Sequence, residues 1–387
     1  MFSLLLVIIY VAFISLGLPD SLLGSAWPVM HEEMGAPMSY AGIVSMIIAG
    51  GTIISSLMSD KLTRKLGAGL VTAVSVAMTA TALFGFSLSG AFWQLCLWAI
   101  PYGLGAGAVD AALNNFVALH YAARHMSWLH CFWGLGASIS PYIMGFCLTG
   151  GYGWHAGYRT VGIVQVVLTV VLFVTLPLWR QKVKEQEEAR ESAAHLPVYK
   201  AIRIKGVPCV LLAFFGYCAM ETTAGLWASS YLVEYRGVDA ETAAMFASLF
   251  YLGITFGRFL NGFVADRLGD KLLVRLGVIV VLVRIVLLGI PVGNNAVALA
   301  GLVVIGVGGA PIYPSIIHAT PINFGAENSQ SIVGIQMASA YVGSTFMPPL
   351  FGAIAGSSHI GAYPIYLGVF AVLMLVMTER LNRVLSK

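Results

Sequence analysis

The sequence predicts an all-helical (all-α) membrane protein whose twelve transmembrane helices form two pseudo-symmetric six-helix bundles. Three observations support this prediction. The 387 residues are 58% hydrophobic and only 10% charged, whereas soluble proteins carry about 25% charged residues. Apolar segments of the length that spans a bilayer, about 20 residues, recur along the whole chain. The two halves of the chain also share features at matching positions.

Twelve apolar segments are separated by mostly short connections, and the first exceeds the roughly 7–15 residues of a signal-peptide core. Their approximate limits are 4–30, 40–59, 67–88, 92–120, 127–149, 158–179, 207–232, 241–264, 272–292, 295–319, 329–355 and 360–378. One long connection contains the charged run 181–191. We therefore expect an N-terminal bundle of residues 1–179, a cytoplasmic linker of residues 180–206 and a C-terminal bundle of residues 207–387.

Basic residues are distributed unevenly among the connections. Most Lys and Arg residues fall on one side, together with the linker, and only Arg159 and Arg236 fall on the other. By the positive-inside rule, both termini and the linker are expected to be cytoplasmic. This orientation explains the net charge of +4 without a nucleic-acid partner. We expect a multi-pass monomer in the lipid bilayer of a bacterial inner membrane.

The two halves repeat at a nearly constant spacing. Asp60 recurs as Asp266, 206 positions later, and Asp20 and Glu221 occupy matching places in the first and seventh segments. Glycines and a proline recur in the same way: Gly136, Pro141 and Gly145 correspond to Gly343, Pro348 and Gly352. Two repeats of parallel topology, with a binding site near the bilayer midplane, are typical of secondary transporters.

Residues 262–271, Gly-Phe-Val-Ala-Asp-Arg-Leu-Gly-Asp-Lys, resemble the loop motif of the major facilitator superfamily, Gly-x-x-x-Asp-Arg-x-Gly-Arg-Arg. The first copy, residues 56–65, departs from the motif, with Ser56 and Thr63 where glycines are expected. Together with the six-plus-six arrangement, the resemblance covers nearly the whole chain. It implies the fold of that superfamily.

Residues 107–117 resemble the helix-4 signature of the fucose:proton symporter group of the superfamily. The signature is a glycine, an acid three positions later, an asparagine four after the acid, and a Phe-Val pair. Here the acid is Asp110 rather than Glu, and Asn115 replaces a proline. The group also carries an acid at a position like Asp20. The resemblance implies that Asp20 and Asp110 act in proton coupling and sugar binding.

Three acids within apolar segments, Asp20, Asp110 and Glu221, are predicted proton-coupling residues. A charge at the centre of a membrane helix costs about 2.5–3.5 kcal/mol on insertion scales, so such acids usually face a cavity or a partner. Removal from water favours the neutral form of a carboxylic acid, which suits a proton carrier. The alternative is a structural role, and for Glu221 an ion pair with Arg284.

Local sequence supports two of these acids. Asn114 lies one helical turn after Asp110, so both side chains project from one face. Glycines at 103, 105 and 107 allow a neighbouring helix to approach closely. Pro19, which cannot donate to the helix ladder, predicts a kinked or unwound helix beside Asp20.

A sugar site requires aromatic platforms and polar side chains that bind hydroxyl groups. His130 can also titrate near neutral pH, although a lone histidine has no second metal ligand near it, so no metal site is expected. Each substrate-binding candidate can instead be a packing residue. The candidates are Asn114, His130, Trp27, Trp133, Trp227, Tyr217, Asn261, Tyr313 and Gln336.

Asp60 and Asp266 are predicted gating residues. In the superfamily such acids hold helix ends together through charge pairs that break when the carrier turns. Arg258 lies eight residues before Asp266, about two turns away on a similar face. The other expected partners are Arg64, Arg124 and Arg267. Solvated loop charge is the alternative.

The chain has no phosphate-binding loop or metalloprotease motif, so we expect no cofactor and no enzyme activity. The leading prediction is a proton-coupled symporter of a sugar or a sugar-like small polar solute, which works by alternating access. The alternative is a proton-linked exporter of drugs or amphipathic metabolites, because residues 136–145 resemble the helix-5 pattern of antiporters. A membrane sensor is disfavoured, because we expect only a short tail after the last helix.

Overall fold

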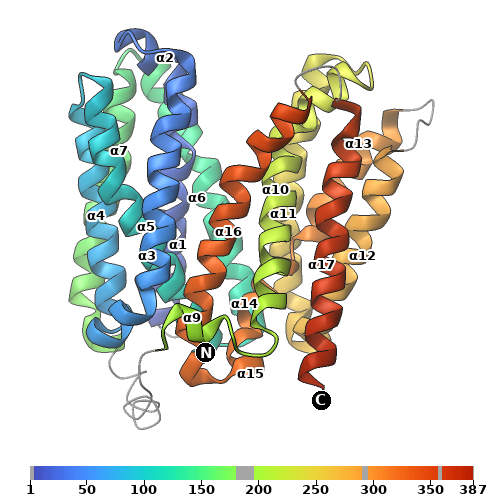
Figure 1. Cartoon of the computed structure of the whole chain (residues 1–387). Helices are drawn as coiled ribbons and strands as arrows, with labels where there is room; N and C mark the ends of the chain where they lie inside the picture. The colour runs from blue at the N-terminus through green and yellow to red at the C-terminus, as the bar shows by residue number, and fades with distance from the viewer. Residues whose placement is uncertain (1–3, 180–195, 290–294, 356–359, 387) are drawn as a thin grey trace. The chain divides into compact units, whose positions relative to one another are not determined.

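The computed structural model describes residues 4–179, 196–289, 295–355 and 360–386, and all regular elements in these ranges are helices (Figure 1). Ten helical stretches are long and apolar enough to cross a membrane. Helices α11 (Ala240–Leu268) and α16 (Ala326–Ala355) are also long enough to span a bilayer. The described residues therefore contain the twelve predicted transmembrane helices. The predicted fold class is confirmed. The charged run 181–191 lies outside the described residues.

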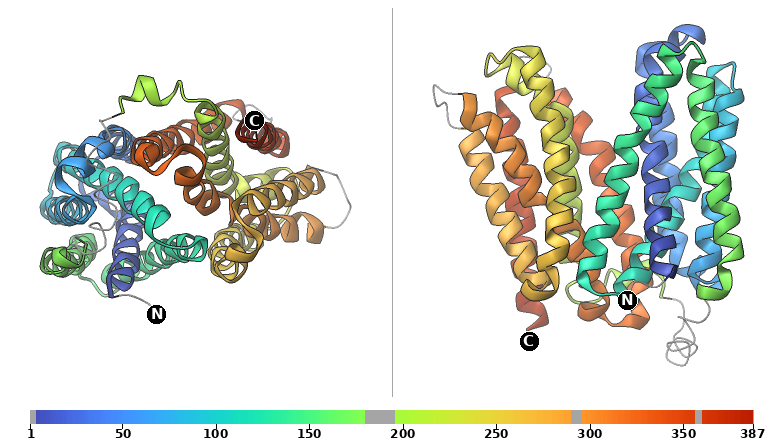
Figure 2. Two further views of the ribbon diagram at one scale, coloured as in Figure 1. Left: turned by 90° about the horizontal axis from the view of Figure 1, so that it is seen from below. Right: turned by 180° about the vertical axis from the view of Figure 1, so that it is seen from behind.

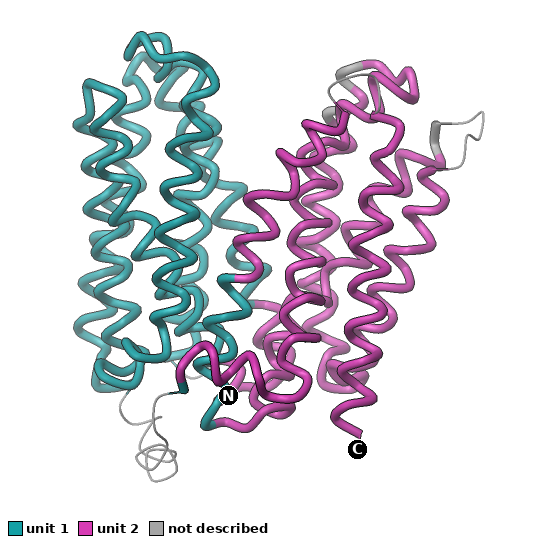
Figure 3. Tube along the Cα trace, viewed as in Figure 1, with its two compact units in different colours: residues 1–116, 129–196, 327–338 teal, residues 117–128, 197–326, 339–387 magenta. Residues whose placement is uncertain are grey.

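The chain divides into two compact units, coloured separately in Figure 3. Unit 1 comprises residues 1–116, 129–196 and 327–338. It contains most of the helices that precede the linker: α1 (Leu4–Asp20), α2 (Leu22–Glu33), α3 (Ala41–Leu66), α4 (Ala68–Leu88), α5 (Phe92–His120), α6 (Ala123–Thr149) and α7 (Gly153–Val174). The first turns of α16 also belong to this unit.

Unit 2 comprises residues 117–128, 197–326 and 339–387. Its helices are α9 (Val198–Ala201), α10 (Val207–Glu234), α11, α12 (Asp270–Gly289), α13 (Asn295–Gly309), α14 (Ile312–His318), α15 (Thr320–Phe324), α17 (Tyr363–Leu385) and the remainder of α16. The junction of α5 and α6 therefore groups with the second half of the chain. The boundary predicted at residues 180–206 stays a prediction, because most of that segment lies outside the described residues.

Within each unit, long helices pack side by side. In unit 1, α4 lies along α7, and in unit 2, α11 lies along α13 and α10 along α17 (Figure 2). Helix α7 leaves one apolar face open, formed by Ile163, Val167, Val170 and Val174, each more than half exposed. These residues recur at helical spacing, so they form the stripe expected of a lipid-facing helix.

The first membrane span is interrupted at one residue, Ser21, beside Asp20, and Pro19 lies within the last turn of α1. Helix α1 ends at Asp20, and α2 begins at Leu22. The backbone carbonyl of Ser21 accepts hydrogen bonds from the backbone N–H of Ser25, at 3.2 Å, and from its hydroxyl, at 2.8 Å. The break leaves the Asp20 carboxylate at the end of a helix, available to side chains of other helices.

Glycines bring α1 and α6 into backbone contact. A Cβ atom added to Gly17 would lie 2.1 Å from the carbonyl oxygen of Trp133, and one added to Gly136 would lie 2.0 Å from that of Ile14. Only hydrogen atoms fit in these spaces. The close approach fixes the register of α6 against α1.

The predicted close approach at glycines 103, 105 and 107 is also present. Gly103 and Gly107 pack on the backbone of α3, and Gly105 packs on α4. Hydroxyl groups of α3 strengthen this contact: Thr52 donates to the Gly103 carbonyl at 3.2 Å, and Ser56 donates to that of Gly107 at 3.2 Å. Helix α5, which carries Asp110, is therefore held rigidly in unit 1.

Candidate functional site

Asp110, Asn114 and His130 form a continuous hydrogen-bonded chain in unit 1. The side-chain amide of Asn114 donates to the Oδ1 atom of Asp110 at 2.7 Å. The Nε2 atom of His130 lies 3.0 Å from the Oδ1 atom of Asn114. Asn114 and His130 are buried, and Asp110 is half-buried. The predicted common face of Asp110 and Asn114 is present, and α6 supplies the third member.

The donor pattern of this chain sets the state of the histidine. Because the Asn114 amide nitrogen donates to Asp110, the amide oxygen is the group that faces His130. An amide oxygen only accepts hydrogen bonds, so Nε2 of His130 must carry a proton. Phe13 of α1 meets the His130 ring edge-on, with 5.5 Å between ring centroids. The imidazole is thus oriented by α1, α5 and α6 together.

A second cluster surrounds Asp20. The hydroxyl of Tyr102 donates to Oδ1 of Asp20 at 3.0 Å, and the indole N–H of Trp133 donates to Oδ2 at 3.0 Å. Tyr102 is buried, while Asp20 itself is exposed within the unit. Trp133 lies one turn beyond His130 on α6, so this helix contributes to both clusters.

Unit 2 contains a buried ion pair between Glu221 of α10 and Arg258 of α11. The Nη2 atom of Arg258 lies 3.5 Å from Oε1 of Glu221. The guanidinium lies over the ring of Tyr313, 5.9 Å from its centroid. The ring of Tyr217 lies edge-on to that of Tyr313, with 6.0 Å between centroids. Glu221, Tyr217 and Tyr313, all predicted from the sequence, therefore lie together.

This pairing corrects two expectations. Glu221 pairs with Arg258 and not with Arg284. Arg258 was expected to pair with Asp266, but eight residues of helix separate the two by about 12 Å along the axis. A buried guanidinium pairs with an acid at its own depth, because an unpaired buried charge is costly. The gating role predicted for Arg258 therefore lacks the contact on which it was based.

The remaining substrate-binding candidates lie mainly in packing contacts. The indole N–H of Trp27 donates to the Met38 carbonyl at 2.7 Å, and that of Trp227 donates to the Pro348 carbonyl at 3.0 Å. The amide of Asn261 donates to the Ser127 hydroxyl at 2.7 Å. Gln336 is fully buried in the part of α16 that belongs to unit 1. Trp27 and Gln336 belong to unit 1, and Trp227 and Asn261 belong to unit 2.

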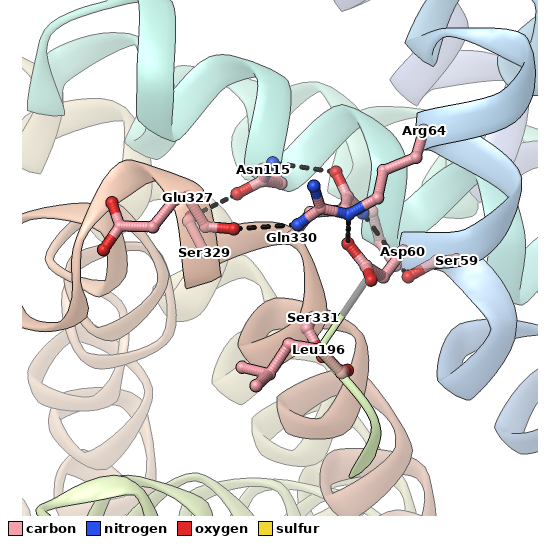
Figure 4. Close-up of polar contacts among 10 residues, drawn as sticks. Ser59, Asp60, Arg64, Asn115, Leu196, Glu327, Ser329, Gln330 and Ser331 are labelled. Atoms are coloured by element: carbon pink, nitrogen blue, oxygen red, sulfur yellow. Dashed lines mark hydrogen bonds and ion pairs between the residues drawn. The ribbon is translucent and has the colours of Figure 1, made fainter. Parts of the chain in front are cut away.

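Asp60 lies in a polar network at one end of unit 1 (Figure 4). The Nε atom of Arg64 donates to Oδ1 of Asp60 at 2.8 Å, and its Nη2 atom donates to the Glu327 carbonyl at 2.9 Å. Asp60 is almost fully buried. The expected pairing of Asp60 with Arg64 is present, and it ties α3 to the first turn of α16.

Uncharged side chains continue this network along α5 and α16 (Figure 4). The amide nitrogen of Asn115 donates to Gln330 Oε1 at 2.7 Å, and the amide oxygen of Asn115 accepts from the Ser329 hydroxyl. All three side chains are buried. Asn115, which replaces a proline of the family signature, is thus the α5 residue that holds the start of α16.

The α5–α6 junction, which belongs to unit 2, contacts α11 and α14 of the same unit. Arg124 forms an ion pair with Asp266, one of the expected pairings, and its backbone N–H donates to the same carboxylate at 3.1 Å. His318 lies between Asp270, at 2.8 Å from Nδ1, and the Tyr121 carbonyl, at 3.3 Å from Nε2. Both groups are acceptors, so both hydrogen bonds require a protonated ring. Arg267 is exposed on α11.

Known proteins share this architecture. The family model of the Major Facilitator Superfamily matches residues 9–335, with a further match over residues 209–383. The chain belongs to the Major Facilitator Superfamily. Its fold is similar to that of the proton:xylose symporter XylE bound to 6-bromo-6-deoxy-D-glucose, with a TM-score of 0.81 at 13% identity, covering 98% of this chain and 94% of that chain.

Another structure with the same superfamily fold is that of a variant of the Escherichia coli fucose:proton symporter FucP, with a TM-score of 0.74 at 14% identity over 97% of each chain. The Bacillus subtilis (strain 168) glucose/mannose transporter GlcP is 22% identical over 349 residues, covering 89% of this chain and 86% of the relative. Matches to other curated relatives are partial: the chain spans 56% of one and 62% of another.

Three residues of this superfamily member were missed by reasoning from its sequence. Tyr102 and Gln330 pair with Asp20 and Asn115, partners that are 82 and 215 residues away along the chain. His318 belongs to no motif that we recognised. Each of the three is a polar residue inside an apolar segment, which the sequence does show. A buried hydroxyl, amide or imidazole needs a hydrogen-bond partner, so each could have been marked as a member of a polar cluster.

Proposed function

We propose that the protein is a proton-coupled symporter of a sugar or a sugar-like small polar solute. The observation that carries this proposal is the chain from Asp110 through Asn114 to His130. A carboxyl group that is hydrogen-bonded to a neutral amide can bind and release a proton, and each change of protonation alters that hydrogen bond. The resemblance to solved sugar:proton symporters supports the same function.

Protonation of Asp110 would change the geometry of this chain. A proton on Oδ1 turns an acceptor into a donor, so the Asn114 amide nitrogen loses one of its two acceptors and keeps the Asp110 backbone carbonyl, at 3.0 Å. The amide is then held less tightly, and the contact of its oxygen with His130 weakens. Hydroxyl groups of a solute can pair with both side chains. Solute affinity would then depend on protonation, which coupling requires.

Orientation and location belong to the same proposal. We propose that both termini and residues 180–206 are cytoplasmic, because most Lys and Arg residues lie in the connections on that side. The two halves would expose the solute site alternately to each side of a bacterial inner membrane, with the protein acting as a monomer.

The direction of proton movement tests the proposal. Purified protein is reconstituted into liposomes that contain a pH-sensitive dye, and a panel of sugars is added outside. A symporter acidifies the lumen when its solute enters, whereas the alternative exporter, an antiporter, makes the lumen alkaline. Alkalinisation by a solute that binds, or solute entry without a pH change, would overturn the proposal.

Trp133→Phe is expected to slow solute uptake about tenfold with little change in melting temperature. The substitution removes the indole N–H that donates to Asp20 at 3.0 Å, while the aromatic ring is kept. A hydrogen bond to a charged group contributes about 1.5–3 kcal/mol. Initial uptake rates in liposomes measure the effect, and Trp93→Phe, at a tryptophan that is 64% exposed, is the matched control. Equal rates for the two variants would remove Asp20 and Trp133 from the site.

A further inference from the structure

The ion pair of Glu221 and Arg258 leaves the Nε–H group of the guanidinium without an acceptor among the described residues. Its single contact of 3.5 Å is long, because good charge-assisted pairs lie at about 2.7–2.9 Å and often use two parallel bonds. The Arg258 side chain is only 4% exposed, and its Nε–H has no acceptor among the described residues. An unsatisfied buried donor costs about 1–3 kcal/mol or more. The site therefore has a cation with a free donor edge.

The groups around Arg258 come from three helices. Tyr217 of α10, Tyr251 of α11 and Tyr313 of α14 are the tyrosines near the pair. The Tyr217 hydroxyl is buried and interacts with both Glu221 and Arg258. Phenol groups are neutral at physiological pH, so Glu221 is the acid that balances the charge of Arg258 there.

We propose that Arg258 binds the carboxylate of the transported solute, so that the solute is an acid of the sugar-acid class rather than a neutral sugar. This inference rests on the proposed function and names its substrate class. A planar guanidinium with a free Nε edge fits a carboxylate better than an isolated hydroxyl. The guanidinium also lies over the ring of Tyr313, with 5.9 Å between Cζ and the ring centroid.

The test measures binding to the purified full chain in detergent, with D-glucuronate and D-glucose as probes that differ at C6. We expect glucuronate to bind at least tenfold more tightly than glucose. Arg258→Gln should weaken glucuronate binding at least tenfold, and Arg258→Lys should weaken it less. Arg284→Gln, at another arginine of a membrane helix in unit 2, is the matched control and should bind as the wild type does.

A further measurement guards against misfolding. The double variant Arg258→Gln/Glu221→Gln has no unpaired charge, so it should fold when Arg258→Gln does not, and it should still fail to bind glucuronate. Glucuronate binding by the double variant with the affinity of the wild type would overturn the role of Arg258.

The outcomes separate this inference from the proposed function. If glucose binds and acidifies liposomes while glucuronate does not bind, the acid class is wrong and the symporter proposal stands. If glucuronate binds through Arg258 but no solute moves protons in liposomes, the carboxylate site stands and the symporter proposal fails. If neither probe binds at millimolar concentration, the sugar-acid class is overturned.

Discussion

Asp110→Asn is expected to abolish accumulation of solute against a gradient while solute exchange across the membrane continues. The asparagine has nearly the same size as the aspartate and still offers an oxygen to the Asn114 amide, which lies 2.7 Å from Oδ1 of Asp110. It cannot take up a proton, so the proton gradient no longer drives the cycle. The measurement compares uptake into liposomes with an imposed pH gradient and exchange without one. We expect accumulation to fall to the equilibrium level.

A control for this prediction must remove a carboxylate elsewhere. Asp239→Asn removes the acid that caps α11, where Asp239 accepts from the Thr242 backbone N–H at 2.9 Å. Asparagine caps helices about as well as aspartate, so this variant should accumulate solute as the wild type does. Full accumulation by Asp110→Asn at neutral pH would show that the proton binds elsewhere.

A partner variant tests whether the neutral amide matters as well as the acid. Asn114→Ala removes the bridge between Asp110 and His130 but keeps both titratable groups. If the chain of hydrogen bonds transmits protonation to the solute site, the variant should transport slowly at every pH. The Asp110→Asn variant, in contrast, should lose only the driving force. The two variants thereby distinguish the residue that binds the proton, Asp110, from the residue that transmits the change in hydrogen bonding to the solute site, Asn114.

The sequence analysis succeeded where function depends on spacing within one helix. Asp110 and Asn114 are four residues apart, and helical geometry alone places them together. The glycines at 103, 105 and 107 predicted close helix packing because no other residue allows backbones to touch. Each of these features depends on residues that are close together in the chain, so the sequence alone is sufficient to predict it.

Partners from different helices could not be predicted in the same way. His130 joins Asn114 only because α6 lies against α5 and α1 in a particular register, and Arg258 joins Glu221 across 37 residues. Repeats and charge counts predict the number of helices and their direction. They do not determine the rotation of each helix about its axis, which decides which side chain of an apolar segment meets a given acid.

Helix α6 shows how packing and chemistry are linked in this protein. Its residues His130 and Trp133 lie one turn apart and contact the two acidic clusters of unit 1. One turn further on, Gly136 rests on the backbone of α1. Three successive turns therefore combine a polar contact with each cluster and the close packing that holds the helix in place. A small shift of α6 would move both polar side chains together.

Gly136→Ala is accordingly expected to destabilise the protein and to impair transport at the same time. The added Cβ would lie 2.0 Å from the Ile14 carbonyl oxygen, and a backbone group cannot move aside as a flexible side chain can. Overpacking of this kind costs about 1–3 kcal/mol, occasionally more. Separation of α1 from α6 also withdraws Trp133 from Asp20. A lower melting temperature and slower solute uptake should appear together.

Gly145→Ala, on the same helix, supplies the matched control. A Cβ on Gly145 meets nothing within 4 Å, and alanine is a better helix former than glycine by about 1 kcal/mol. This variant should melt at the same temperature as the wild type or higher, with normal uptake. Gly17→Ala approaches the same contact from α1, where its Cβ would lie 2.1 Å from the Trp133 carbonyl oxygen, so it should reproduce the Gly136→Ala defect. Identical melting of the Gly136→Ala and Gly145→Ala variants would mean that α1 and α6 are not in backbone contact, and the positions of His130 and Trp133 would lose their structural basis.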